Sequence, residues 1–164
     1  RISHVSTSAT GSFFRITWQG IVLGEISLNI PGRHNVLNAT AALAAGIALD
    51  LNPNQLISGL SKFHGVRRRF ELKGDVKNIR VFDDYAHHPT EVSATIATAR
   101  DVVAGGKIIV IFQPHRYSRT LAFAEGFAES LSVADQVILL DIYGAGEESI
   151  PGASSSVIAK QIET

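Results

Sequence analysis

Residues 107–112 (Lys-Ile-Ile-Val-Ile-Phe) form a nearly continuous apolar run, and residues 137–142 (Val-Ile-Leu-Leu-Asp-Ile) form a second one. Such runs are typical of strands that are covered on both faces, as in a parallel sheet. A third strand is predicted at residues 79–84, and a helical pattern follows each strand. The three helices are expected at residues 89–103, 118–131 (with Ser118 as the cap) and 154–162. Because strands alternate with helices, we predict a Rossmann-like α/β layer with mainly parallel pairing and right-handed crossovers.

The first part of the chain has a different pattern. Residues 11–29 carry strand-type residues on both sides of a Gln-Gly pair, which predicts a β-hairpin. From Asn35 an Ala-rich stretch has apolar residues at helical spacing, and Pro53 is placed to begin a second, short helix. A further strand at residues 69–73 is expected to connect to residues 79–84 through a polar turn. The change of pattern predicts a domain boundary near Gly65, with domains at residues 1–65 and 66–164.

The composition limits the function classes. The 164 residues are 45% hydrophobic and 18% charged, with 15 basic and 15 acidic side chains, so no bulk charge indicates nucleic acid or an anionic membrane as a partner. The absence of Cys excludes disulfides and thiolate zinc sites. No apolar stretch is long enough for a membrane span and no signal peptide opens the sequence, so a soluble, cytoplasmic protein is expected. Since the chain starts at Arg1 and has no Met, we expect it to be a piece of a longer protein.

Polar side chains gather just after the three predicted strands. In an open parallel sheet, ligands bind beyond the carboxyl ends of the strands, so these segments are predicted to form one surface. The segments hold half of the six histidines, two arginines and three tyrosines: His87, His88, His115, Arg116, Arg119, Tyr85, Tyr117 and Tyr143.

Arg116 and Arg119 are three residues apart in a loop that enters a helix. Both could face one anion, such as a carboxylate or a phosphate. The alternative is that one or both form solvated ion pairs with Asp84 or Glu91, worth at most ~1 kcal/mol each.

The neighbouring polar residues leave similar alternatives open. His87 could bind a metal, transfer protons or donate to an anion, whereas His88 directly precedes a helix and could simply order its start. No set of ligands at zinc-like spacing accompanies them, so no metal site is expected. Asp84 could accept from a ribose hydroxyl, or it could cap a turn or bridge to Arg69.

His34 and Asn38 are four residues apart and therefore share a helix face. The amide of Asn38 lies in an otherwise apolar helix and needs a partner, which an adenine edge could supply. The plain alternative makes Asn35 the N-cap and Asn38 a surface residue. Residues 67–69 are three consecutive arginines, either a solvated edge or a contact to a phosphate at the domain boundary. Neither GxxxxGK[ST] nor GxGxxG occurs, so the main phosphate cradle of a nucleotide site is missing from the sequence.

Four segments together resemble the Mur ligases: GRHNVLNATAALA (32–44), GVRRRFE (65–71), DDYAHHPTEV (83–92) and FQPHRYSRT (112–120). The resemblance runs from about residue 11 to residue 152. It implies an ATP-dependent amide-bond ligase of peptidoglycan synthesis, which supports cell-wall biogenesis, cell shape and cell division. ATP would phosphorylate the carboxyl group of UDP-N-acetylmuramate, and the amino group of L-alanine would attack the acyl phosphate. In this family a UDP-sugar domain and a central ATPase domain precede a Rossmann-like C-terminal domain.

The same resemblance assigns expected roles to residues. Residues 1–65 would be the end of the central ATP-binding domain, and residues 66–164 an incomplete C-terminal domain. The ATP contacts would be His34, Asn35, Asn38, Arg69 and Asp84. The incoming amino acid would be held by Tyr85, His87, His115, Arg116 and Arg119, with the arginines on its carboxylate.

Several parts of the family pattern are missing from this sequence. They are the phosphate loop with its lysine, the ligands of Mg²⁺, the carbamylated lysine and the UDP-sugar domain. We therefore expect no catalytic residue and no ligase activity in these 164 residues alone. Two other functions stay open: a ligase that joins UDP-N-acetylmuramate to a recycled tripeptide, and a non-catalytic nucleotide-binding module.

Overall fold

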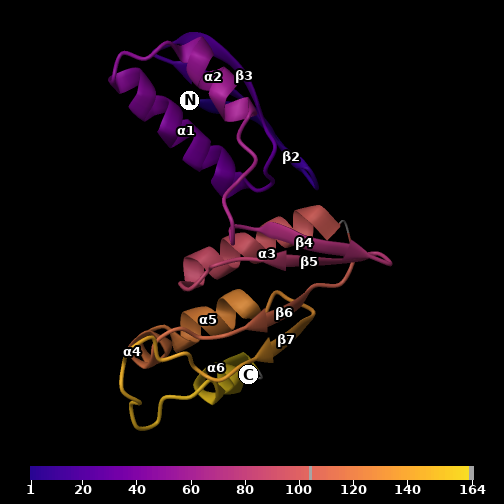
Figure 1. The fold of residues 1–164 in the computed structure, drawn as a ribbon, viewed down its shortest axis with the longest axis vertical. Helices are drawn as coiled ribbons and strands as arrows, with labels where there is room; N and C mark the ends of the chain where they lie inside the picture. Colours follow the sequence, from indigo (N-terminus) through magenta and orange to yellow (C-terminus); the bar gives the residue numbers. More distant parts are fainter. Residues whose placement is uncertain (104, 163–164) are drawn as a thin grey trace. The chain divides into compact units, whose positions relative to one another are not determined.

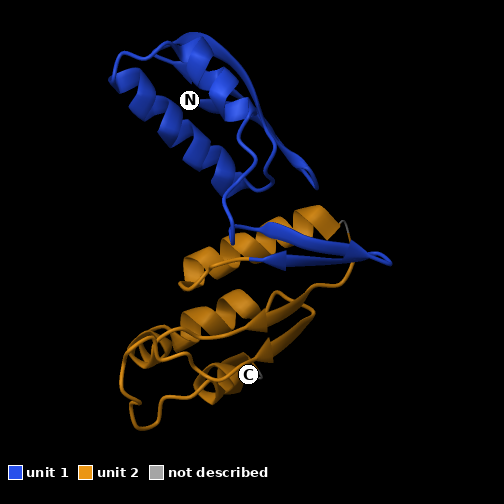
Figure 2. Ribbon diagram, in the orientation of Figure 1, with its two compact units in different colours: residues 1–83 blue, residues 84–164 orange. Residues whose placement is uncertain are grey.

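The computed structural model of the chain describes residues 1–103 and 105–162. The chain divides into two compact units, residues 1–83 (unit 1) and residues 84–164 (unit 2) (Figure 2). Compactness alone does not define a domain, so the predicted boundary near Gly65 stays a prediction. Unit 1 contains β1 (Ile2–Ser8), β2 (Gly11–Trp18), β3 (Ile21–Leu28), α1 (Arg33–Ala48), α2 (Pro53–Ser61), β4 (Glu71–Val76) and β5 (Ile79–Asp83). Unit 2 contains α3 (Pro89–Val103), β6 (Ile109–Phe112), α4 (Tyr117–Ala122), α5 (Ala124–Leu131), β7 (Gln136–Leu139) and α6 (Ser156–Ile162) (Figure 1).

The predicted hairpin is confirmed as β2 and β3. Gln19 (φ 48°) and Gly20 (φ 83°) form its two-residue turn, in the left-handed conformation that matches the twist of the strands. Strand β1, which pairs antiparallel with β2, was not predicted, because its middle is polar and does not alternate. One face of this sheet packs on α1 and α2. The buried side chains of that core are Phe14, Ile16, Ile26, Leu28, Val36, Ala39 and Leu43.

Helix α1 begins two residues earlier than predicted. Its N-cap is Gly32, whose φ of 101° favours glycine, so the alternative that makes Asn35 the N-cap is wrong. Asn35 lies inside the first turn, where its Nδ2 donates to the carbonyl oxygen of Pro31 (2.7 Å). Asn35 therefore fixes the entry of the chain into the helix.

The second predicted hairpin is confirmed as β4 and β5, with a shorter turn than expected. The turn is Lys77 (φ 51°) and Asn78 (φ 64°), and the strands pair antiparallel. Strand β4 begins at Glu71 rather than at residue 69, because Arg68 (φ 57°) and Phe70 (φ 49°) are left-handed and leave the extended conformation.

Unit 2 has the predicted α/β character. Strands β6 and β7 are parallel, and Val110 lies opposite Val137. Among the described strands, parallel pairing is confirmed for this pair alone, since β5 pairs antiparallel with β4. Helices α3, α5 and α6 enclose the core, whose buried side chains are Val92, Ile96, Ile108, Phe112, Ala124, Phe127, Ala128, Leu131 and Ile158.

The helix expected at residues 118–131 is two helices. It breaks at Phe123 (φ −122°, ψ 20°), which ends α4 and precedes α5. The N-cap of α4 is Arg116, so the expected cap, Ser118, lies inside the helix. None of the described helices combines the length and apolarity that crossing a membrane would need.

Candidate functional site

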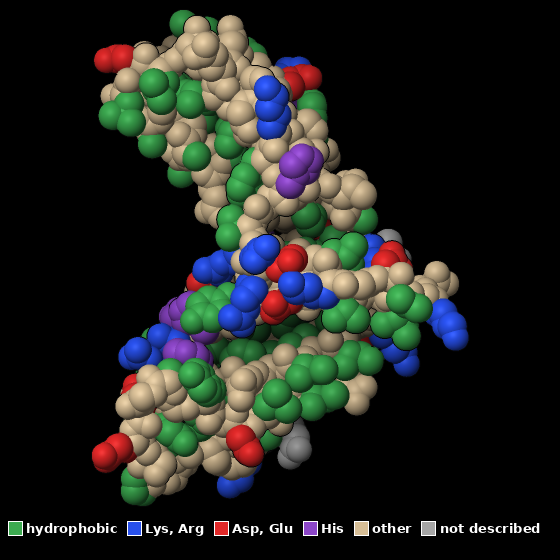
Figure 3. All heavy atoms as spheres, in the orientation of Figure 1, with side chains coloured by type: hydrophobic (Ala, Val, Ile, Leu, Met, Phe, Trp, Pro, Cys, Tyr) green, Lys and Arg blue, Asp and Glu red, His purple; other side chains and the backbone are tan. Residues whose placement is uncertain are grey.

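The loops after β6 and β7 lie side by side because the two strands are parallel. Beyond the strands, Tyr143 N donates to Pro114 O (2.9 Å) and Arg116 N donates to Tyr143 O (2.8 Å). His115 forms a parallel bridge with Tyr143, and the centroids of their rings are 5.5 Å apart. The polar residues that follow the two strands therefore meet at one edge, as predicted from the strand ends. Figure 3 shows histidine and basic side chains gathered at one edge of unit 2.

Arg116 is held in a conformation that a non-glycine residue rarely adopts. Its φ is 74°, and its carbonyl oxygen accepts from both Thr120 N (3.1 Å) and Thr120 Oγ1 (2.7 Å). Thr120 is completely buried, so this anchor is rigid. Strained backbone that is fixed on both sides is common at ligand-binding positions.

Arg119 contacts His115 on the same surface. The Nη1 atom of Arg119 lies 3.4 Å from Nδ1 of His115. Since a guanidinium can only donate, the imidazole accepts through Nδ1 and carries its proton on Nε2. Partial burial lowers the pKa of His115, and the positive charges of Arg119 and Arg116 lower it further. The site thus combines two guanidinium groups with an imidazole whose lowered pKa favours its neutral form.

His87 brings the loop after β5 to this group. Its ring centroid is 6.3 Å from that of His115 and 5.2 Å from that of Tyr85. Its backbone N donates to Glu91 Oε2 (2.9 Å), and its Nδ1 lies 3.3 Å from the same oxygen. The sequence analysis considers Glu91 only as a possible ion-pair partner of Arg116 or Arg119. Its position four residues after His87, in the first turn of α3, was the available signal for its role as a support of His87.

His88 has a structural role at the start of α3, which is the alternative named in the sequence analysis. Its Nδ1 accepts from Thr90 N (3.3 Å), and its carbonyl oxygen accepts from Val92 N (3.0 Å). It therefore orders the start of α3, with its ring against Phe123 (4.8 Å between centroids). Asp84 Oδ1 accepts from Ala86 N (2.7 Å), which stabilises the turn after β5.

The acid that lies near Arg116 is Glu147, rather than the Asp84 or Glu91 considered from the sequence. Glu147 Oε1 is 3.9 Å from Arg116 Nη1. Hydrogen bonds from Ser118 lower the pKa of the Glu147 carboxyl, and the charge of Arg116 adds to the effect. Glu147 is therefore an anion at the edge of the site.

The predicted ATP residues other than Asp84 lie in unit 1. Asn38 is exposed on α1 one turn after His34, so water can solvate its amide and a partner is not required. The expectation that the Asn38 amide needs a protein or ligand partner is therefore wrong. The exposed side chain is nevertheless accessible to a ligand. Arg69 lies before β4, where its backbone N donates to Val66 O (3.2 Å).

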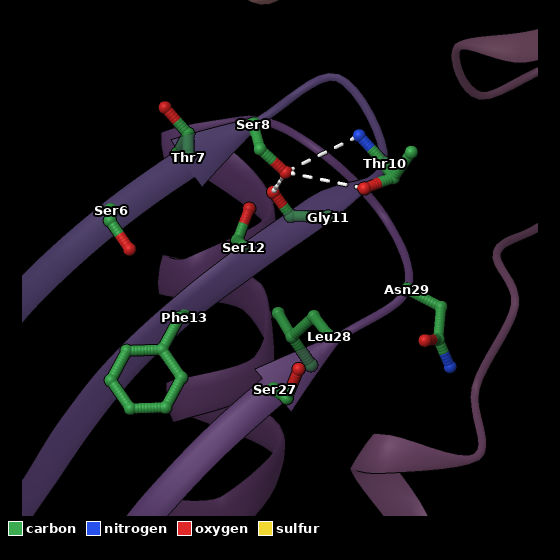
Figure 4. A pocket seen from close by; sticks show the side chains of 10 residues that line it. All are labelled: Ser6, Thr7, Ser8, Thr10, Gly11, Ser12, Phe13, Ser27, Leu28 and Asn29. Atoms are coloured by element: carbon green, nitrogen blue, oxygen red, sulfur yellow. Dashed lines mark hydrogen bonds between the residues drawn. The ribbon is translucent and has the colours of Figure 1, made fainter.

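Unit 1 also carries a pocket of about 200 Å³ at the ends of β1, β2 and β3 (Figure 4). It is lined mainly by hydroxyl-bearing residues, together with Phe13, Leu28 and Asn29, and Ser8 Oγ donates to Gly11 O there (3.2 Å). No charged side chain lines it, so it offers hydrogen bonds without an anchor for an ionic ligand. Within residues 1–103 and 105–162, no three His, Asp or Glu side chains are grouped as a metal ion would require.

The class that this fold and surface define is an α/β domain with cationic side chains at the carboxyl ends of parallel strands, the place where open α/β sheets commonly bind ligands. The family model described as "Mur ligase, glutamate ligase domain" matches residues 68–164, which is more than half of the chain. The chain belongs to the Mur ligase family. This finding confirms the resemblance that the four sequence segments carry.

Two curated relatives are UDP-N-acetylmuramate–L-alanine ligases. The chain is 44% identical over 162 residues to that of Acidothermus cellulolyticus, covering 99% of this chain and 34% of the relative. It is 52% identical over 139 residues to that of Mycolicibacterium smegmatis, covering 84% of this chain and 29% of the relative. The chain therefore spans about a third of the length of these relatives.

Solved structures agree with the fold. The UDP-N-acetylmuramate-alanine ligase of Thermotoga maritima superposes with a TM-score of 0.80 at 32% identity, over 99% of this chain and 34% of that one. A murein peptide ligase of Psychrobacter arcticus gives a TM-score of 0.62 at 26% identity, over 98% of this chain and 32% of that one.

Proposed function

We propose that the chain is part of an ATP-dependent ligase that joins L-alanine to UDP-N-acetylmuramate through an acyl phosphate. Membership of the Mur ligase family and the names of the two curated relatives support this proposal. The structural observation that carries it is the contact of Arg119 with His115, with Arg116 next to His115 in the chain and the ring of His87 close by, at the carboxyl ends of the strands.

The chemistry of this group suits a free amino acid. Arg116 and Arg119 would bind the α-carboxylate, since a guanidinium binds carboxylates with paired, charge-assisted hydrogen bonds. The rings of Tyr85, His87 and His115 would surround the remainder of the small substrate. A second anion site of this kind has no use in a module that binds only a nucleotide, which argues against the non-catalytic alternative.

ATP would bind mainly outside the amino-acid group. Asn38 on α1 offers the donor and acceptor that an adenine edge needs, and it is exposed. His34 lies on the same helix face, and Asn35 would hold the start of α1 in place through its bond to Pro31. Arg69 would contact the terminal phosphates and Asp84 the ribose. Mg²⁺ would accompany the phosphates, with its protein ligands outside these 164 residues.

The experiment that tests this function is amide-bond formation by the complete protein. ATP and UDP-N-acetylmuramate are supplied with either L-alanine or the recycled tripeptide, and phosphate release and the peptide product are measured. The proposal expects turnover with L-alanine and a kcat/KM at least about tenfold higher than with the tripeptide. Preference for the tripeptide would assign the chain to the recycling ligases. Absence of turnover with either acceptor would favour the binding module.

A further inference from the structure

Glu147 connects the turn after β7 to the start of α4, and it does so directly beside Arg116. We propose that Glu147 is a positioning residue for the acceptor carboxylate. Its two hydrogen bonds with Ser118, here called the latch, hold the turn after β7 against the start of α4. The latch thereby fixes the direction in which Arg116 presents its guanidinium. This inference rests on the proposed function, because it assumes that Arg116 binds the carboxylate of the amino acid.

The latch consists of two hydrogen bonds from one residue. Ser118 Oγ donates to Glu147 Oε1 (2.6 Å), and Ser118 N donates to Glu147 Oε2 (3.1 Å). Both carboxylate oxygens are therefore used, and the two residues are 29 positions apart in the sequence. A bidentate contact of this kind fixes orientation as well as distance.

The turn that presents Glu147 is itself well defined. Glu147 N donates to Gly144 O (3.0 Å), and the two residues between them, Ala145 (φ 51°) and Gly146 (φ 87°), are both left-handed. Gly144 packs so closely that an added Cβ would lie 3.0 Å from the Tyr117 ring. The carboxylate thus comes from a tight turn pressed against the first residue of α4, rather than from a loosely placed side chain.

Arg116 is held by the same turn at a second point. Its backbone N donates to Tyr143 O (2.8 Å), at the residue that precedes the turn. The segment from Arg116 to Ser118 is therefore fixed at both ends by residues 143–147. Between these two points Arg116 keeps its left-handed φ of 74°, a conformation that needs such constraints to persist.

The direct ion pair between Glu147 and Arg116 is weak, which is consistent with a positioning role for Glu147. Glu147 Oε1 is 3.9 Å from Arg116 Nη1, and the side chains are 25% and 49% exposed. A solvated pair at this separation contributes little binding energy. Arg116 can therefore exchange Glu147 for the carboxylate of a substrate, while the two bonds to Ser118 keep α4 in place.

The test begins with four single-residue variants of the complete protein. Glu147→Ala removes the latch. Glu147→Gln removes the charge but can keep both contacts, because its amide oxygen accepts from Ser118 N while its NH₂ donates to Ser118 Oγ. Glu148→Ala is the matched control, because Glu148 is the adjacent, exposed acid. Ser118→Ala removes one of the two bonds.

We expect Glu147→Ala to raise the KM for L-alanine about tenfold or more, with the KM values for ATP and UDP-N-acetylmuramate within about twofold. Glu147→Gln should stay within about threefold of the parent, and Glu148→Ala should match it. Ser118→Ala should raise the KM for L-alanine by about threefold, and combining it with Glu147→Ala should add nothing, because both act through one contact.

Two results would overturn the inference. One is a Glu147→Ala protein that matches Glu148→Ala. The other is a loss that appears in kcat for all substrates together with a lower Tm, which describes general destabilisation. Should Glu147→Ala not fold, Ser118→Ala decides alone, and an unchanged KM for L-alanine then refutes the latch. An Arg116→Ala protein that keeps its KM for L-alanine would instead refute the proposed function, so the two failures are distinguishable.

Discussion

The guanidinium of Arg119 lies 3.4 Å from Nδ1 of His115, so a permanent cation donates to an imidazole four residues earlier in the chain. This contact requires the neutral form of His115, because a protonated imidazole has no acceptor atom. Partial burial and the charges of Arg119 and Arg116 favour the same neutral form by lowering the pKa of His115. The contact and the titration of His115 are therefore linked.

This linkage predicts how His115 titrates. Its NMR titration midpoint should lie below the ordinary histidine value of about 6.5. Because the folded pKa is lowered, the unfolded chain binds more protons between the two pKa values, so His115 makes folding less favourable as the pH falls below about 6.5. Arg119→Ala should move the midpoint upward, since it removes a nearby positive charge. Arg15→Ala, in unit 1, is the control and should not move it. A midpoint at or above 6.5, or one that Arg119→Ala leaves in place, would contradict this account.

Arg116→Ala in the complete protein should affect the acceptor amino acid above all. If Arg116 binds a desolvated carboxylate, kcat/KM for L-alanine should fall at least about 30-fold, equivalent to about 2 kcal/mol. The KM for ATP should stay within about twofold. Arg116→Lys should recover only part of the loss, because an ammonium cannot make the paired hydrogen bonds of a guanidinium. Equal losses for all substrates, or none, would remove Arg116 from this role.

The residue patterns predicted elements better than their exact limits. The two apolar runs correctly indicated β6 and β7. The expectation that both strands are covered on both faces is wrong, because Ile109, Ile111 and Ile138 are exposed on one face of this two-stranded sheet. Strand β1 was missed because its polar middle pairs with β2 through the backbone, which leaves no side-chain pattern. The break at Phe123 was missed because the apolar spacing continues from α4 into α5 across a change in backbone direction.

For the site, the strand-end rule correctly brought His87, His115 and Arg119 together. The rule could not find the supporting acids. Glu147 acts on Ser118 through a turn whose shape depends on two left-handed residues, and no spacing in the sequence encodes that approach. Its role became visible only from the geometry of the folded loops.

Asp135 is expected to stabilise unit 2 in a pH-dependent way. Its Oδ2 accepts from Ile108 N (2.7 Å) and lies 2.7 Å from Arg100 Nη1, which ties α3 to the starts of β6 and β7. The backbone bond from Ile108 is the main reason that the pKa of Asp135 is lowered, and Arg100 adds to it. A lowered carboxyl pKa gives stability that is present above the unfolded value of about 3.9 and is lost as the pH falls through the folded value.

Asp135→Asn should therefore lower the Tm at neutral pH, and the difference from the parent should shrink as the pH falls below about 4. Thermal unfolding followed by circular dichroism at several pH values measures this. Glu129→Gln, a change on the exposed surface of α5, is the control and should leave the Tm unchanged. A Tm difference that is constant across this pH range would show that the charge of Asp135 is not what stabilises the unit.

The isolated 164-residue chain should not catalyse the ligation, even if both units fold. Its sequence contains no GxxxxGK[ST] loop, so the backbone amides and the lysine that would hold the ATP phosphates are not supplied. We expect no phosphate release above background from ATP, UDP-N-acetylmuramate and L-alanine, and a much weaker affinity for ATP than that of the complete protein. Circular dichroism and calorimetric titration with ATP, alongside the coupled assay, separate a folded but inactive chain from an unfolded one. Turnover by the folded, isolated chain would mean that these 164 residues contain a phosphate site of another design. The proposal that the ATP phosphates are held mainly by residues outside this sequence would then be wrong.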